Sequence, residues 1–249
     1  MSYQNWNASE YAKHASFVPA MASDVVKLLN PQAGEAILDV GCGDGELTKL
    51  LKENGCVVVG IDFSPSMVEM TKSHGIEAYV MDGHKIRFEN RFDSVFSRAE
   101  LQWLTQPEKA IAGVYSALKK NGRFVAEFGG KGNVAALLDA MQNVFEENPD
   151  FGPFSMPWYF PSTEEYRKLL EQAGFQVNYI ELIPRPTPLK SGLEKWLEIF
   201  AEGITRGLGK EQKSKFLSAT AEKLRNILYT DQAGWVADYV RLRVEARKT

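Results

Sequence analysis

The sequence is poor in cysteine and histidine, the side chains that most often bind transition metals. Its 249 residues include two cysteines and three histidines, and none of them stands at the spacing of a metal-ligand motif. Cys42 and Cys56 form neither a CxxC pair nor a disulfide framework. We therefore expect no metal site, and we expect both cysteines to be buried thiols.

An excess of charge and long apolar runs are also missing. Lys and Arg number 29 against 32 Asp and Glu, a formal net charge of -3, which lacks the basic excess that binding to nucleic acid requires. No stretch reaches the ~18 apolar residues of a membrane span, and the first residues lack a secretory-signal pattern. We expect a cytoplasmic globular protein, monomeric or homodimeric, with no nucleic-acid partner and no stable membrane association.

The chain does have a regular alternation of short apolar runs and helical patterns. The runs that read as strands lie at 36–40, 57–62, 78–81, 92–97 and 122–128. Helical spacing of leucines and other apolar residues occupies 46–53, 65–73 and 107–118, and Ser64 with Pro65 suits the start of the second helix. This alternation predicts a doubly wound α/β sheet whose ligands bind at the carboxyl ends of the strands.

The second half of the chain adds further elements. Helical patterns cover 134–147, 162–173 and most of 189–230, while 174–180 and 237–246 read as strands. The whole predicts a Rossmann-like, seven-stranded sheet with a helical cap inserted between the last two strands. The expected boundaries are 1–188 for the core with an N-terminal helical gate, 189–231 for the cap and 232–249 for the final strand.

A glycine-rich loop, Asp39-Val40-Gly41-Cys42-Gly43-Asp44-Gly45, joins the first strand to the first helix. Its backbone amides and the helix N-terminus can face a polar ligand without intervening side chains. The dinucleotide fingerprint GxGxxG needs a third glycine where Glu46 stands. Asp39 would repel a pyrophosphate and would suit an ammonium and a sulfonium. The loop favours a cationic cofactor, with a nicotinamide-dependent oxidoreductase or a plain turn as the alternatives.

Two more strands end in an acid. Asp62 is placed to accept hydrogen bonds from a ribose diol, and Asp82, beside the permissive Gly83, suits the exocyclic amine of adenine. Met67, one helical turn after Asp62, could cover an adenine face or belong to the core. Carboxylates are costly to desolvate, so we expect acids gathered at this edge to have a partner there.

In order and spacing, these motifs resemble those of the class I S-adenosylmethionine-dependent methyltransferases. The resemblance rests on residues 38–45, 60–64, 82–83 and 92–97. It implies S-adenosyl-L-methionine as the cofactor. The contacts that it implies are Asp39 and the Gly41, Cys42 and Gly43 backbone at the methionine end, Asp62 at the ribose, Asp82 and Gly83 at the adenine, Phe63 and Met67 beside the adenine, and the Ser97 carbonyl at the methionine ammonium.

A narrower resemblance is to the trans-aconitate methyltransferase group. It rests on residues 6–11, 99–103 and 196–200. It implies a small organic acceptor methylated at a carboxyl oxygen. Separately, Tyr11 and Trp6 in the N-terminal helical region could close over the cofactor as a gate. Methylation at another oxygen, nitrogen or carbon of a metabolite, quinone precursor or lipid stays open, as does a cofactor-binding protein without turnover.

The candidate catalytic residues depend on the acceptor. A carboxylate needs no general base, and Arg98 could orient it by bidentate contact or could instead form a structural salt bridge. A phenol, enol or amine would need a base, for which His14 is the first candidate and Glu100 and Glu127 are others. The aromatic stretch at 151–160 could line the acceptor pocket or pack in a core of its own.

Overall fold

The computed structural model describes residues 23–249. Trp6, Tyr11 and His14 therefore lie outside the described residues, and their roles stay predictions. The described chain divides into two compact units. We call them the sheet unit (23–131, 159–183 and 241–249) and the helical unit (132–158 and 184–240). Each is described by itself.

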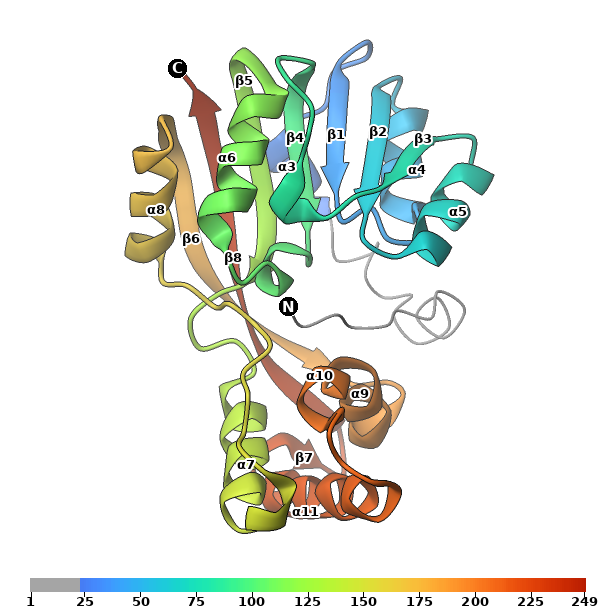
Figure 1. Ribbon diagram of the computed structural model, residues 1–249, viewed down its shortest axis with the longest axis vertical. Helices are drawn as coiled ribbons and strands as arrows, with labels where there is room; N and C mark the ends of the chain where they lie inside the picture. Colours follow the sequence, from blue (N-terminus) through green and yellow to red (C-terminus); the bar gives the residue numbers. More distant parts are fainter. Residues whose placement is uncertain (1–22) are drawn as a thin grey trace. The chain divides into compact units, whose positions relative to one another are not determined.

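The sheet unit confirms the predicted doubly wound α/β architecture. Its strands run in the order β3-β2-β1-β4-β5-β8-β6, and the first five of these pair in parallel while β8 is antiparallel to β5 (Figure 1). Their bounds are β1 (Ala36–Val40), β2 (Val57–Asp62), β3 (Glu77–Val80), β4 (Phe92–Arg98), β5 (Leu118–Gly129), β6 (Phe175–Pro188) and β8 (Gly234–Lys248). The chain changes direction across the sheet between β1 and β4, so a ligand site is expected at their carboxyl ends.

Helices cover both faces of this sheet. Alternate strand residues point to opposite sides, so each face presents apolar side chains that a helix must bury. Leu38 and Phe124 belong to a core with α6 (Pro107–Ala117) and α8 (Thr163–Gln172). Their neighbours Ile37 and Val125 belong to a second core with α3 (Ser23–Leu29) and α4 (Glu46–Glu53) (Figure 1). With both faces covered, the strand ends are left for a ligand.

Local sequence explains where the helices of the sheet unit begin. α5 (Pro65–Ser73) starts as predicted: Ser64 is the N-cap, its hydroxyl accepts a hydrogen bond from the amide of Met67, and proline follows at the first position. Ser162 and Glu165 form a capping box at the start of α8. Residues 119–122 form a bulge inside β5, since Leu118 pairs with Phe92 and Arg123 with Ser94.

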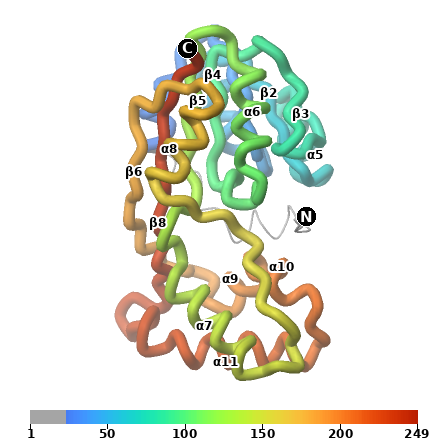
Figure 2. The backbone as a smooth tube through the Cα atoms, turned by 60° about the vertical axis from the view of Figure 1, so that its left-hand side comes forward, coloured from blue at the N-terminus to red at the C-terminus, as the bar shows by residue number. Residues whose placement is uncertain are grey.

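The helical unit contains α7 (Ala135–Glu146), α9 (Gly192–Phe200), α10 (Glu202–Thr205), α11 (Lys210–Leu228) and the short β7 (Tyr229–Thr230). It thus includes residues 132–158 as well as the segment expected to form the cap. Helices α7 and α11 lie side by side (Figures 1 and 2). Asp238 of β8 caps α7, because its Oδ2 accepts a hydrogen bond from the amide of Ala136 at 2.8 Å.

Part of the aromatic stretch forms the core of this unit. Phe151 and Phe154 pack edge to face on Phe145, each with ring centroids 5.5 Å apart, and Phe216 of α11 packs there at 5.8 Å. Of the two roles predicted for the aromatic stretch, Phe151 and Phe154 therefore have the second, packing in a core of their own. Within residues 23–249, no helix has the length and apolar character that crossing a membrane requires.

Candidate cofactor site

The glycine loop after β1 is held by backbone hydrogen bonds. The amides of Gly41 and Cys42 both donate to the carbonyl of Ile61, at 2.8 and 3.0 Å, and Thr71 Oγ1 donates to the carbonyl of Gly43 at 2.9 Å. Gly41 and Gly43 have φ angles of 78° and 57°, a backbone region that residues with a side chain rarely adopt. These bonds hold the loop in one fixed course. The amides of Gly41, Cys42 and Gly43, which the sequence suggested would face a ligand, are bonded instead to the Ile61 carbonyl and to Asp62.

The two glycines face different surroundings. A Cβ on Gly41 would collide with Cβ and Cγ of Glu100, whereas a Cβ on Gly43 would meet nothing within 4 Å. Gly41 is thus packed closely by the chain that follows β4, and Gly43 borders open space. That open space beside a fixed backbone is where a ligand can approach the loop.

Asp39, the acid before the loop, is buried, with 3% of its surface exposed. Thr48 Oγ1 of α4 donates to its Oδ2 at 2.6 Å. Burial raises the pKa of Asp39 to about 7; the Thr48 hydrogen bond opposes that rise and the nearby Asp62 adds to it. Without a ligand, Asp39 is therefore only partly ionised near neutral pH, and its cost of ionisation falls when a cation is near.

Asp62 joins two loops at the end of β2. Its Oδ2 accepts a hydrogen bond from the amide of Gly43 at 3.0 Å, and its Oδ1 accepts one from the amide of Ser64 at 2.8 Å. Burial raises its pKa despite these bonds. The expected adenine neighbours differ in exposure: Phe63 is 43% exposed and Met67 only 3%. Phe63 can reach a ligand, while Met67 packs in the protein.

Asp82 follows β3 and is oriented by the next turn, η1 (Gly83–Lys85). Its Oδ1 receives hydrogen bonds from the His84 amide at 2.9 Å and from the His84 ring at 2.7 Å. Burial opposes ionisation, but these bonds prevail and lower the pKa of Asp82. Gly83 packs against Leu104, whose Cδ1 would lie 2.7 Å from an added Cβ, so only glycine fits there without a shift of Leu104.

Glu100 completes a group of four carboxyls from four strand ends. Burial raises its pKa to about 8, and the charges of Asp62, Asp82 and Asp39 add to the rise. No cluster able to bind a metal occurs among the described residues. The sequence predicts Glu100 only as a candidate base, although its place just after β4 already puts it at the same sheet edge.

Ser97 and the cysteines have structural contacts in this region. Ser97 Oγ donates to the carbonyl of Val40 at 2.8 Å, which links β4 to β1 at their carboxyl ends. Cys42 and Cys56 are free and buried, and burial raises the pKa of both thiols. The expectation of two buried thiols is confirmed. The Ser97 carbonyl lies at the edge where the resemblance places the methionine ammonium.

Arg98 and Glu127 lie in a buried row of charges. Arg98, Glu127 and Arg243 are register neighbours on β4, β5 and β8. Arg243 donates to Glu127 Oε2 at 2.8 and 2.6 Å, and Arg98 Nε lies 3.9 Å from Glu127 Oε1. The Arg98 side chain is 7% exposed. Glu127 is therefore engaged by two arginines, and a contact between Arg98 and an acceptor stays a prediction.

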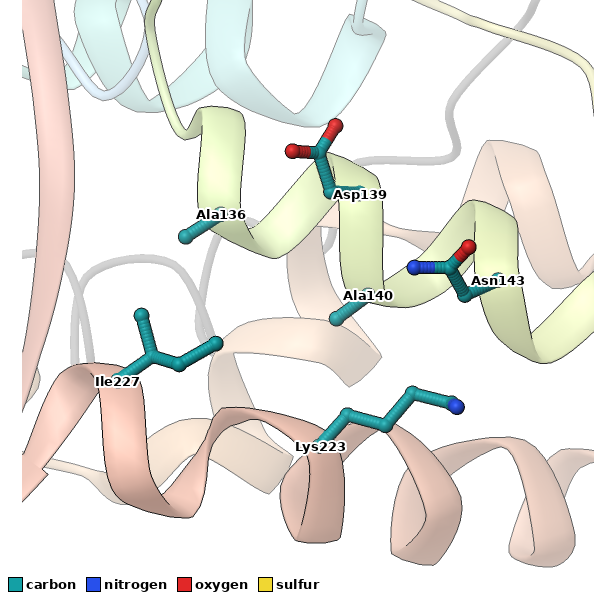
Figure 3. Close-up of a pocket in the computed structure, with 6 residues that line it drawn as sticks. All are labelled: Ala136, Asp139, Ala140, Asn143, Lys223 and Ile227. Carbon is teal, nitrogen blue, oxygen red and sulfur yellow. The ribbon is translucent and has the colours of Figure 1, made fainter.

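The helical unit has a separate groove of about 480 Å³ between α7 and α11 (Figure 3). Its lining residues are Ala136, Asp139, Ala140, Asn143, Lys223 and Ile227. Lys223 is bonded to Glu147 at 2.6 Å, and Ile227 is 64% exposed. None of these residues is one of the four acids Asp39, Asp62, Asp82 and Glu100.

Comparison with known proteins gives consistent results. A family model described as a methyltransferase domain matches residues 38–126, which span the glycine loop and all four carboxyls. An uncharacterized methyltransferase of Schizosaccharomyces pombe is 36% identical over 262 residues, 98% of either chain. Malonyl-[acyl-carrier protein] O-methyltransferase of Priestia megaterium is 28% identical over 205 residues, 78% of this chain and 72% of that protein.

A solved structure has the same fold. Phosphoethanolamine N-methyltransferase 2 of Haemonchus contortus, in complex with phosphomonomethylethanolamine and S-adenosylhomocysteine, gives a TM-score of 0.63 at 21% identity. The match covers 97% of this chain and 56% of that one.

Proposed function

Because the chain belongs to the class I S-adenosylmethionine-dependent methyltransferase family, we propose that it methylates a carboxylate oxygen of a small organic acceptor. The observation that carries the cofactor assignment is the convergence of Asp39, Asp62, Asp82 and Glu100 on one sheet edge. Two of these carboxyls have pKa values raised to about 7 and about 8, so a bound cation would relieve their desolvation.

The residues present fit this cofactor. Its ammonium and sulfonium match the negative edge, and the open space at Gly43 lets it approach the loop backbone. Asp62 would hold the ribose and Asp82, fixed by His84, the adenine. When bound, S-adenosylmethionine supplies an electrophilic methyl group. The protein's task is then to align the acceptor oxygen with it and to exclude water.

A carboxylate acceptor is supported by Arg98. Its guanidinium follows Ser97 at the end of β4, beside the switch point, and it shares Glu127 with the more closely bonded Arg243. A guanidinium at this edge of the sheet can hold an acceptor carboxylate by bidentate contact. A carboxylate acceptor is already a nucleophile, so no proton has to be removed.

We further propose that the chain belongs with the trans-aconitate-like group of small-molecule methyltransferases. The support is the 99–103 segment, from which the Glu100 side chain packs on Gly41, and the 196–200 segment of α9. Tyr11 and His14 complete this proposal as gate and alternative base.

The test is transfer of label from methyl-labelled S-adenosylmethionine to a pool of organic acids, with an RNA pool as a separate arm. The expected product is a small methyl ester, which mild alkali hydrolyses to labelled methanol. Label that resists alkali would indicate methylation at another atom, and label in RNA would replace the small acceptor by a nucleic acid. Cofactor binding without transfer to either pool would indicate a protein without turnover. Thermal stabilisation by NAD or NADP but not by S-adenosylhomocysteine would indicate an oxidoreductase.

A further inference from the structure

Glu100 and Gly41 face each other across the switch point of the sheet. Gly41 follows β1 and Glu100 follows β4, the adjacent strand. The first two carbons of the Glu100 side chain pack so closely on Gly41 that a Cβ there would collide with both. The side chain therefore runs over the glycine loop rather than away from it.

The backbone that places Glu100 is fixed on both sides. Ala99 has a φ of 57°, an uncommon conformation for a residue with a side chain. Its amide donates to the Glu127 carbonyl at 2.8 Å, and Gln102 Nε2 donates to its carbonyl at 2.5 Å. The amide of Trp103 donates to the carbonyl of Glu100 at 2.8 Å. Strained backbone of this kind persists only where the surroundings determine it, and it is concentrated at functional sites.

Three carboxylates at the same sheet edge interact electrostatically with Glu100: Asp39 in β1, Asp62 at the end of β2 and Asp82 just after β3. Burial and these charges hold its pKa near 8, so the carboxyl is largely protonated at neutral pH until a cation arrives. An arriving cation lowers that pKa and drives the proton off.

The order of the strand ends shows which part of the cofactor is near Glu100. With the adenine at Asp82 and the ribose at Asp62, the cofactor crosses the sheet edge from β3 to β2. Its sulfur and methionine then lie at β1 and β4, where Gly41 and Glu100 are. S-adenosylmethionine has a positive sulfur there. In S-adenosylhomocysteine that sulfur is neutral, because the methyl group has left to the acceptor while the S–C electron pair stays on sulfur.

We propose that Glu100 is the residue by which the site distinguishes S-adenosylmethionine from S-adenosylhomocysteine. The inference rests on the proposed cofactor. Glu100 ionises against the sulfonium, and after methyl transfer it takes up a proton from water because its cationic partner is gone. The product is then held less tightly than the substrate, which favours its release.

The test compares the affinities of three probes by calorimetry at pH 8.5: S-adenosylmethionine, S-adenosylhomocysteine and sinefungin, which has an amine in place of the methylsulfonium. In Glu100→Gln, we expect binding of the two cationic probes to weaken about tenfold, the equivalent of one pKa unit. The affinity for S-adenosylhomocysteine should change by less than about twofold, well below the tenfold change that one pKa unit represents. Glu53→Gln, an exposed glutamate on α4, is the matched control and should leave all three unchanged.

A second measurement needs no variant. In the unaltered protein, the preference for S-adenosylmethionine over S-adenosylhomocysteine should be greater at pH 9 than at pH 6, since Glu100 is ionised without cost only above its pKa. Equal weakening of all three probes in Glu100→Gln, or a preference that does not change with pH, would overturn the proposal. If the unaltered protein binds none of the probes, the cofactor assignment itself fails, and Glu100 with it.

Discussion

Replacing Gly41 by alanine should destabilise the protein more than the same change at two other glycines of positive φ. Gly34, Gly41 and Gly43 have φ angles of 86°, 78° and 57°, so alanine at each costs about 1–2 kcal/mol for the left-handed backbone. A Cβ at Gly34 or Gly43 would meet nothing within 4 Å, but at Gly41 it would collide with Glu100. Overpacking of this kind adds about 1–3 kcal/mol, which makes the total for Gly41→Ala about 2–5 kcal/mol.

The clash involves Cβ of Glu100, which the backbone places, so a change of rotamer cannot relieve it. Thermal unfolding of the unliganded variants, followed by circular dichroism, measures the effect: each kcal/mol lowers Tm by about 2–4 °C in a chain of this size. Glu100→Gly removes the opposing carbons, so Gly41→Ala should cost less in that background than in the unaltered protein. Unfolding of Gly41→Ala at the same temperature as Gly43→Ala and Gly34→Ala would show that Glu100 does not oppose a side chain at Gly41.

Three further changes test the rest of the site. Asp62→Ala should weaken cofactor binding at least tenfold, about 1.4 kcal/mol, through loss of the ribose acceptor; unchanged affinity by calorimetry would remove Asp62 from the site. Arg98→Ala should raise the acceptor KM in steady-state assays and leave cofactor affinity unchanged, whereas equal damage to both would make Arg98 structural. Burial raises the pKa of Asp39 to about 7. The protonated Asp39 carboxyl therefore stabilises the unliganded fold at low pH, and this contribution is lost as pH rises from about 4 to 7. Urea unfolding across that range should show a weaker pH dependence in Asp39→Asn, and an identical profile would count against the buried, protonated carboxyl.

Several elements were predictable to the residue because their signals are local. The strand at 57–62 and the helix at 46–53 have the bounds expected of them, since period-3.6 spacing and a continuous apolar run are visible within one segment. Ser64 and Pro65 likewise marked the start of α5. The start of β5 was less visible, because residues 119–122 look like a turn and are held in the sheet as a bulge only by pairing with β4.

The helical unit shows where local signals stop. Helical periodicity predicts α7 at 134–147, within one residue of its observed bounds at either end. It does not predict that the Ala136 amide donates to Asp238, about a hundred residues further along the chain. The aromatic stretch has the composition of either a pocket wall or a core, and the ring contacts of Phe151 and Phe154 with Phe145 were needed to distinguish them for these side chains.

The amino-acid sequence alone determined the class of fold, the glycine loop and the acids Asp39, Asp62 and Asp82 at the carboxyl edge. It could do so because strand ends in a parallel sheet are adjacent by construction, so position along the chain translates directly into position at the edge. Only the tertiary structure decided what each charge faces. It brought Glu100 onto Gly41 and shared Glu127 between Arg98 and Arg243, since burial, pairing and pKa depend on groups that the fold brings together from distant segments.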